Sequence, residues 1–189
     1  DRRLKRNPIR GRAIIFFHPW SKLRLAGLNP SQAFALDQDL AIVAEGIDGS
    51  GKSTQARSLL RRLRRRGVKV LRTHEPGGTP LGQSLRRLLK SGKAMTPMSE
   101  LMLFEAARAQ LVQNVIRPFL QQGGVVIADR FTSSTMAYQG TAGGVPLDRI
   151  RQLHAAALGD FRPDLTLVLD LDPRTGLERT VARGEDATR

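Results

Sequence analysis

Eight consecutive residues, Gly46 to Ser53, read G-x-x-x-x-G-K-S and constrain the fold more than any other part of the chain. Glycines in such a loop permit positive φ angles and let backbone N–H groups approach an anion closely. The motif requires a strand before it and a helix after it, and an apolar run over 40–45 and a helical pattern over 54–66 match both requirements. An accidental glycine-rich turn is the alternative. The residues predicted to contact a nucleoside triphosphate are Gly46, Asp48, Gly49, Ser50, Gly51, Lys52, Ser53 and Thr54.

Two residues of this loop carry specific chemistry. Lys52 is expected to reach the β and γ phosphates, and the hydroxyl of Ser53 is expected to bind Mg²⁺. A second site is expected at Asp129 and Arg130, because they follow the apolar run 125–128 and ligands of open α/β sheets bind at the carboxyl ends of strands. Asp129 could hold hydrated Mg²⁺ and Arg130 a phosphate. A structural ion pair that caps the strand is the alternative for these two residues.

The formal net charge of +14 raises the question of nucleic-acid binding. The charge is spread along the chain, since residues 1–39 hold eight basic and three acidic residues. A run of arginines over 61–66 falls at the end of the first expected helix of the domain, where cations suit the helix dipole, and no aromatic residue interleaves with it. The apolar run 13–17 is far shorter than the roughly 20 residues that cross a bilayer. We therefore expect neither a nucleic acid nor a membrane as a partner.

The composition changes near residue 39. Residues 1–39 are basic, contain three prolines and show no sustained hydrophobic period, so we expect an N-terminal extension that forms no part of the core. The first residue is Asp1 and the earliest methionine is Met95, so we expect the chain to lack its own start. Translated upstream sequence, a remnant of a preceding segment or a targeting signal are the alternatives for this extension.

Over residues 40–189, strand-like and helix-like segments alternate. This alternation predicts an α/β fold of βαβ units, with a parallel sheet and helices on both of its faces. Four strands are expected over 40–45, 68–72, 125–128 and 165–169, and helices over 54–66, 81–90, 98–122, 132–139, 146–158 and 173–183. A sheet of this kind normally has a further strand and covering helix, so we expect the domain over 40–189 to lack its last strand and helix.

One pair of residues suggests how a base could be bound. Phe104 and Arg108 lie four residues apart and therefore on one face of their expected helix. The pair suits a flat base that stacks on the ring and accepts a hydrogen bond, although Phe104 taken alone is more typical of a core. Arg86 and Arg87 follow a Pro-Gly-Gly turn and could reach a phosphate at the same end of the sheet, with a solvated helix face as the alternative.

Six segments occur in the order and at the spacing of the thymidylate (dTMP) kinases, and the chain from Leu40 to Arg189 resembles that family. The segment over 129–140 is highly specific. The six segments are Gly46–Ser53, His74–Thr79, Phe104 with Arg108, Asp129–Phe131, Ser134–Gly140 and Pro163–Leu167.

The resemblance implies a three-layer P-loop nucleoside monophosphate kinase fold and phosphoryl transfer from ATP to dTMP with Mg²⁺, in dTTP biosynthesis. It also implies a cytoplasmic enzyme and a homodimer packed through helices. The implied catalytic residues are Lys52, Asp129, Arg130 and Arg183, and the implied metal ligands are Ser53 and Asp129. The residues implied to bind dTMP are Asp48 at the sugar hydroxyl, Glu75 in a loop beside the acceptor, Arg86 and Arg130 at the phosphate, Phe104, Arg108 and Thr135 at the base, and Tyr138 at the ribose 2′ position.

The chain departs from parts of the family at two positions. Gly49 stands where one branch has an arginine inside the phosphate loop, whereas the other branch supplies arginine from a mobile lid. Arg179, Arg183 and Arg189 lie where that lid begins, and an ordinary exposed arginine is the alternative for each. His74 stands where many bacterial relatives have arginine, which affects one loop contact.

Two other functions stay open from the sequence. One is a kinase for another nucleotide, such as dUMP or CMP, or for a nucleoside. The other is a nucleotide-binding module without turnover, which an incomplete chain would favour.

Overall fold

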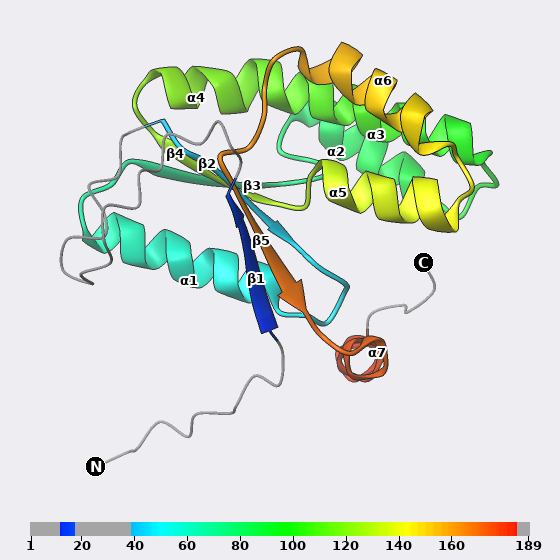
Figure 1. Cartoon of the computed structure of the whole chain (residues 1–189), viewed down its shortest axis with the longest axis horizontal. Helices are drawn as coiled ribbons and strands as arrows, with labels where there is room; N and C mark the ends of the chain where they lie inside the picture. Colours follow the sequence, from blue (N-terminus) through cyan, green and yellow to red (C-terminus); the bar gives the residue numbers. More distant parts are fainter. Residues whose placement is uncertain (1–11, 18–38, 185–189) are drawn as a thin grey trace.

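Five strands form one sheet in the order β1-β5-β2-β4-β3. The computed structural model of the chain describes residues 12–17 and 39–184 (Figure 1). The four strands expected from the sequence form and run parallel to one another. They are β2 (Ala41–Glu45), β3 (Val70–His74), β4 (Val125–Asp129) and β5 (Leu165–Asp170).

A fifth strand, β1 (Arg12–Phe17), lies within residues 1–39 and corrects the expectation that the sheet has four strands. It pairs antiparallel with β5, so that Arg12 lies opposite Asp170 and Phe17 opposite Leu165. The run Ala-Ile-Ile-Phe-Phe has high β propensity but is too short to show a period, and the free edge of β5 offers backbone groups for pairing. The other residues of the expected extension up to 38 lie outside the described part of the chain.

Every helix expected from the sequence forms within a few residues of its predicted bounds. The single helix expected over 98–122 contains a widened π-helical turn, η1, that ends two residues before Pro118. Proline cannot donate the ordinary helical bond to the carbonyl of Asn114, and a wider turn accommodates its ring. The helical elements are α1 (Lys52–Arg65), α2 (Pro80–Leu89), α3 (Pro97–Leu111), η1 (Val112–Ile116), α4 (Arg117–Gln121), α5 (Thr132–Thr135), η2 (Met136–Ala142), α6 (Leu147–Leu158) and α7 (Pro173–Val181).

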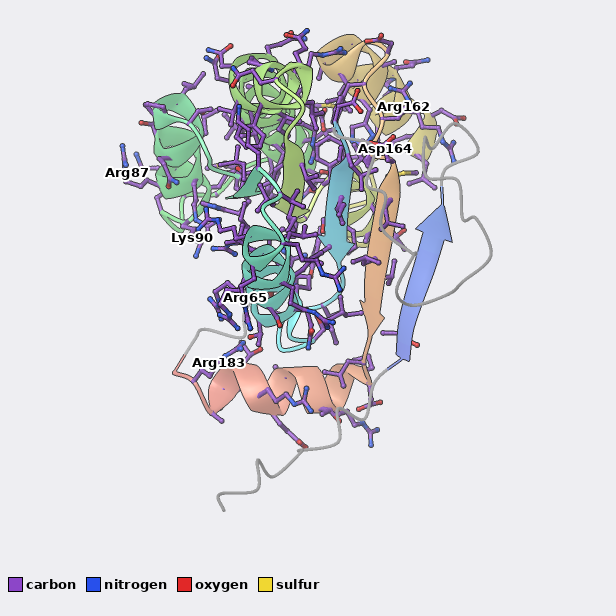
Figure 2. The ribbon with its side chains drawn as sticks, turned by 90° about the vertical axis from the view of Figure 1, so that its left-hand side faces the viewer. Arg65, Arg87, Lys90, Arg162, Asp164 and Arg183 are labelled. Atoms are coloured by element: carbon purple, nitrogen blue, oxygen red, sulfur yellow. The ribbon has the colours of Figure 1, made fainter. Side chains whose placement is uncertain are left out.

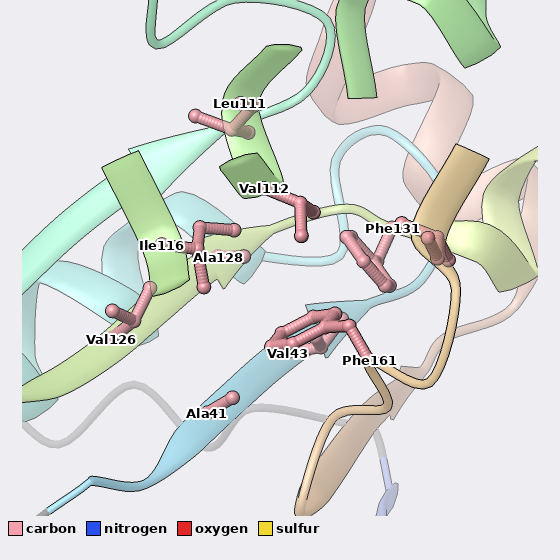
Figure 3. Packing of buried hydrophobic residues seen from close by; sticks show 10 residues of the cluster. Ala41, Val43, Leu111, Val112, Ile116, Val126, Ala128, Phe131 and Phe161 are labelled. Carbon is pink, nitrogen blue, oxygen red and sulfur yellow. The ribbon is translucent and has the colours of Figure 1, made fainter. Parts of the chain in front are cut away.

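The sheet lies between two layers of helices (Figure 1). On one face α1 packs through Ala56 and Leu63 against a buried cluster that includes Ile42 and Ile127. The other face is covered by the helices from α3 to α6, and Figure 3 shows its core. Alternate residues of β2 and β4 point to opposite faces, and both faces are buried, which explains why these strands read as continuous apolar runs. The second core cluster comprises Ala41, Val43, Leu111, Val112, Ile116, Val126, Ala128, Phe131, Leu158 and Phe161.

The parallel strands bring separate segments together at one edge of the sheet. In the register of the sheet Ala44 of β2 and His74 of β3 both lie opposite Asp129 of β4. The chain therefore leaves the carboxyl ends of β2, β3 and β4 at neighbouring points, which is where α/β sheets bind ligands. Among the described residues, no helix has the length and hydropathy that a membrane crossing requires.

Candidate functional site

The phosphate loop, residues 46–53, connects β2 to α1 with a backbone that only glycine adopts readily. Gly46, Gly49 and Gly51 have φ angles of 142°, 80° and 93°. Gly51 is the N-cap of α1, and no side chain caps that helix end. The first N–H groups of α1 therefore remain available for an anion, and the helix dipole favours one there. The loop has the features that binding of a phosphate requires.

Lys52 lies back across the phosphate loop. Its ammonium donates to the Ile47 carbonyl at 2.7 Å and lies 3.6 Å from the Asp48 carboxylate. Burial and the nearby charge of Arg130 lower the pKa of Lys52, while Asp48 and Asp129 act in the opposite direction. A buried cation is thus held within a few ångströms of the backbone groups that would bind phosphate.

The two residues expected at the metal, Ser53 and Asp129, are brought together by α1 and β4. The Ser53 hydroxyl donates to Asp129 Oδ2 at 2.5 Å, and Arg72 of β3 lies 3.9 Å from the same oxygen. A hydroxyl and a carboxylate are oxygen ligands of the kind that Mg²⁺ prefers. No group of three or more His, Cys, Asp or Glu side chains in the described part of the chain could hold a metal. The Ser53 hydroxyl and the Asp129 carboxylate could together supply two oxygen ligands to a Mg²⁺ ion.

Arg130 joins the end of β4 to the phosphate loop. Its Nη2 donates to Asp48 Oδ1 at 2.6 Å, its Nη1 donates to Ser134 Oγ at 3.0 Å, and its guanidinium lies 5.2 Å from the centre of the Tyr138 ring. Burial is the largest single influence on the pKa of Asp48 and would raise it, but the charges and hydrogen bonds of Arg130 and Lys52 together outweigh burial, so that pKa lies below its usual value. Arg130 has a φ of 71°, an uncommon conformation for a residue with a side chain. The fold thus places the Arg130 guanidinium and the Asp48 carboxylate side by side.

Glu45, the last residue of β2, holds the chain after Arg130 in position. Its carboxylate accepts from the backbone N–H of Phe131 at 2.9 Å and from the Ser134 hydroxyl at 2.6 Å. Sequence analysis missed Glu45 and Ser134 as parts of the site. A carboxylate at the end of an otherwise apolar buried strand is the signal that could have found Glu45, because such a charge needs partners.

Arg108 lies at the centre of a buried polar cluster between α3, α5 and the loop after β3. Its Nε donates to Glu75 Oε2 at 2.8 Å, and its Nη2 donates to Thr135 Oγ1 at 2.8 Å. Its Nη1 donates to Glu105, which lies one turn earlier on α3. The sequence predicted a role for Arg108, Glu75 and Thr135 individually, and the structure brings all three into contact. It did not predict Glu105.

Glu75 is an unusual carboxylate because it is buried. Burial raises its pKa to about 7, although the adjacent charge of Arg108 opposes that rise. Its Oε2 accepts from Arg108, while its Oε1 has no hydrogen-bond partner among the described residues. A carboxyl group in this position is poised between its neutral and charged forms near neutral pH.

Two further predicted residues lie around this cluster. Arg86 of α2 donates to the Pro76 carbonyl at 3.0 Å, which places it at the loop that contains Glu75. Phe104 lies one turn before Arg108 on α3 and is half-buried. Burial, followed by the charges of Arg86 and Arg72, lowers the pKa of His74 at the end of β3. Arg86 and Arg72 therefore place positive charge beside the end of β3.

The start of α7 packs against the phosphate loop. A Cβ on Gly49 would lie 2.2 Å from the carbonyl oxygen of Gly176, and Arg179 Nη1 lies 3.4 Å from the Gly49 carbonyl. Arg183, the lid residue expected to be catalytic, is exposed one turn further along, beyond the end of α7 (Figure 2). Arg179 thus contacts the phosphate loop, and Arg189 lies outside the described residues.

Comparisons with known proteins find similar sequences and a similar fold. The family model for thymidylate kinase matches residues 44–189. The thymidylate kinase of Cereibacter sphaeroides is 53% identical over 148 residues, which cover 77% of this chain and 68% of that protein. The thymidylate kinase of Ectopseudomonas mendocina is 51% identical over 147 residues, which cover 77% and 70% of the two chains. The crystal structure of thymidylate kinase from Ehrlichia chaffeensis superposes with a TM-score of 0.69 at 41% identity, covering 75% of this chain and 78% of that chain.

Proposed function

This chain belongs to the thymidylate kinase family, and from that premise we propose that it transfers the terminal phosphoryl group of ATP to dTMP, giving ADP and dTDP for dTTP biosynthesis. The observation that carries the proposal is the contact of 2.6 Å between Arg130 and Asp48. It joins the phosphate loop, which suits a triphosphate, to the cation at the end of β4, which suits a second phosphate. Donor and acceptor groups would therefore meet at adjoining strand ends.

On the donor side, the backbone of the phosphate loop and Lys52 would bind the β and γ phosphates. Ser53 and Asp129 lie close enough to supply oxygen ligands to one Mg²⁺, which would neutralise charge on the phosphate oxygens. Phosphoryl transfer needs little covalent help from a protein, so positive charge and in-line positioning supply most of the catalysis. Lys52 and Arg130 would provide that charge from opposite sides of the transferred group.

On the acceptor side, the proposal assigns each predicted residue to one part of dTMP. Arg130 and Arg86 would bind the phosphate, and Asp48 would accept a hydrogen bond from the sugar hydroxyl. Phe104 would stack on thymine, while Arg108 would donate to a carbonyl on its edge and Thr135 would lie nearby. Tyr138 would lie at the 2′ position, where a ribose hydroxyl would be crowded. Glu75 would act through its ion pair with Arg108.

The lid completes the proposal. Arg183 remains our predicted catalytic arginine, and Arg179 is the second candidate because of its approach to Gly49. Either guanidinium would stabilise charge on the transferred group once the lid has closed over ATP and excluded water. We also propose a homodimer packed through helices and a cytoplasmic location, as the family resemblance implies.

The direct test is ADP release with a panel of acceptors. The chain should release ADP with dTMP and Mg²⁺, and removing Mg²⁺ with a chelator should abolish the reaction. dTMP should have a higher kcat/KM than dUMP, CMP or AMP. A preference for CMP or AMP would contradict the proposal, and ATP binding without any phosphoryl transfer would indicate a nucleotide-binding module instead.

A further inference from the structure

The contact between α3 and α6 contains a glutamate–histidine pair that the proposed reaction does not use. Glu105 of α3 and His154 of α6 are both largely buried, and His154 Nε2 lies 3.1 Å from Glu105 Oε1. The same carboxylate accepts from Nη1 of Arg108. Glu105 is therefore the link between the buried arginine and the neighbouring helix.

Arg108 has another carboxylate partner besides Glu105. Its Nε forms an ion pair of 2.8 Å with Glu75, and its side chain is only 1% exposed. The buried cluster thus contains two carboxylates and one guanidinium. A second buried carboxylate adds a desolvation cost to this cluster.

Glu105 also lacks the full set of partners that a purely stabilising carboxylate would have. Its Oε2 and His154 Nε2 are buried and have no aligned hydrogen-bond partner among the described residues. Unpaired buried polar atoms destabilise a fold. What Glu105 does determine is the direction of the guanidinium plane, because Nε and Nη1 of Arg108 are each bound to a different carboxylate.

We propose that Glu105 and His154 are positioning residues for the acceptor base: Glu105 fixes the Nη1 end of Arg108, and His154 fixes Glu105 from α6. This inference rests on the proposed function, in which Arg108 donates to a carbonyl of thymine. The pair then sets where that donor meets the base. It should affect the binding of dTMP and the discrimination against a base that presents an amino group instead of that carbonyl, as cytosine does.

The test compares Glu105→Gln and His154→Gln with the unchanged chain. Glu105→Gln keeps the shape of the side chain but weakens the hold on Arg108, so KM for dTMP should rise about tenfold while kcat changes less than twofold. The preference for dTMP over dCMP in kcat/KM should fall by a similar factor. His154→Gln should show the same pattern with a smaller effect, because it acts through Glu105.

A double-mutant cycle separates positioning from general stability. In an Arg108→Lys background, Glu105→Gln should raise KM for dTMP less than twofold further, since the guanidinium that it positions is gone. Asp148→Asn is the matched control, because it removes a carboxylate from an exposed ion pair of α6 with Arg151. That control should leave KM and the preference over dCMP unchanged.

Each outcome decides between the two proposals. If the unchanged chain turns over dTMP and both variants keep its KM and its base preference, the positioning role is contradicted. The proposed function is not contradicted by that result. Equal losses in both Arg108 backgrounds also contradict the positioning role and indicate a structural role. If the unchanged chain does not phosphorylate dTMP, the proposed function fails and this inference fails with it. Thermal unfolding identifies a variant that does not fold, in which case the other variant carries the test.

Discussion

The fold requires glycine at position 49 because there is no space for a side chain. The φ of Gly49 is 80°, and a Cβ there would lie 2.2 Å from the backbone oxygen of Gly176 in α7. Gly49→Ala should therefore force the phosphate loop and α7 apart, lowering the free energy of unfolding by about 3 kcal/mol. Gly51→Ala is the matched control, since its φ of 93° is strained but nothing lies within 4 Å of its Cβ. Urea unfolding that gives equal losses for both variants would contradict the close packing.

Arg130 has the most specific predicted effect on catalysis. Arg130→Ala should lower kcat/KM for dTMP by about a hundredfold, which corresponds to the loss of about 3 kcal/mol from a charged hydrogen-bonding group. Binding of an ATP analogue should change little, because the glycines and Lys52 of the phosphate loop remain. Arg151→Ala, which removes an exposed arginine from α6, is the control. Unchanged turnover in Arg130→Ala would remove this residue from the site.

The raised pKa of Glu75 predicts a pH dependence of stability. A pKa of about 7, compared with 4.5 for the free group, means that the folded chain binds this proton more tightly than the unfolded chain. Stability should therefore fall as pH rises from about 4.5 to about 7, by about 3 kcal/mol for this group. The charged groups around it are Arg108 and Glu105 of α3 and Glu45 of β2. In urea unfolding between pH 5 and pH 8, the stability of Glu75→Gln should not show this decline. If the stability of the variant and of the unchanged chain falls equally with pH, Glu75 is not the cause of the decline.

At the scale of elements, the long helix formed by α3, η1 and α4 both covers the sheet and carries site residues. Ile116 of η1 is 1% exposed and packs against the sheet (Figure 3). Ile116→Ala should lower the free energy of unfolding by about 2–5 kcal/mol, because it removes buried methyl groups and leaves a cavity. Met102→Ala, on the exposed face of α3, should change stability by less than about 1 kcal/mol. If urea unfolding gives similar losses of unfolding free energy for the two variants, the assignment of Ile116 to the buried layer against the sheet is contradicted.

For the whole molecule, the proposed reaction predicts two separate binding sites that are both formed by folding. A non-hydrolysable ATP analogue and dTMP should each raise the melting temperature, and together they should raise it further. A ligand at a hundred times its Kd adds about 2.7 kcal/mol to the stability of the folded state. Thermal unfolding measures these shifts, with CMP as the control for dTMP. A shift with ATP analogue but none with dTMP would contradict the acceptor site.

The elements of this fold were largely predictable because their signals are local. The apolar runs of β2 and β4 show that these strands are buried on both faces, and the phosphate loop has a spacing that few other structures use. β1 was missed because a strand of six residues at the edge of a sheet depends on its partner, β5, which lies about 150 residues away in sequence. Pairing over that distance leaves no periodic pattern in the strand itself.

The order of the strands from β2 to β5 and of the helices, the phosphate loop and the residue types that such a site requires were predictable, because each of these depends on neighbouring residues. Which charges meet depends instead on the packed fold. Arg130 reaches Asp48 across 82 positions, Arg108 reaches Glu75 across 33, and His154 faces Glu105 from another helix. Burial then decides how strongly these charges interact, since removing water both raises the pKa of Glu75 and strengthens its pairing with Arg108. Burial depends on how the layers pack, so it cannot be predicted from a local segment of the sequence.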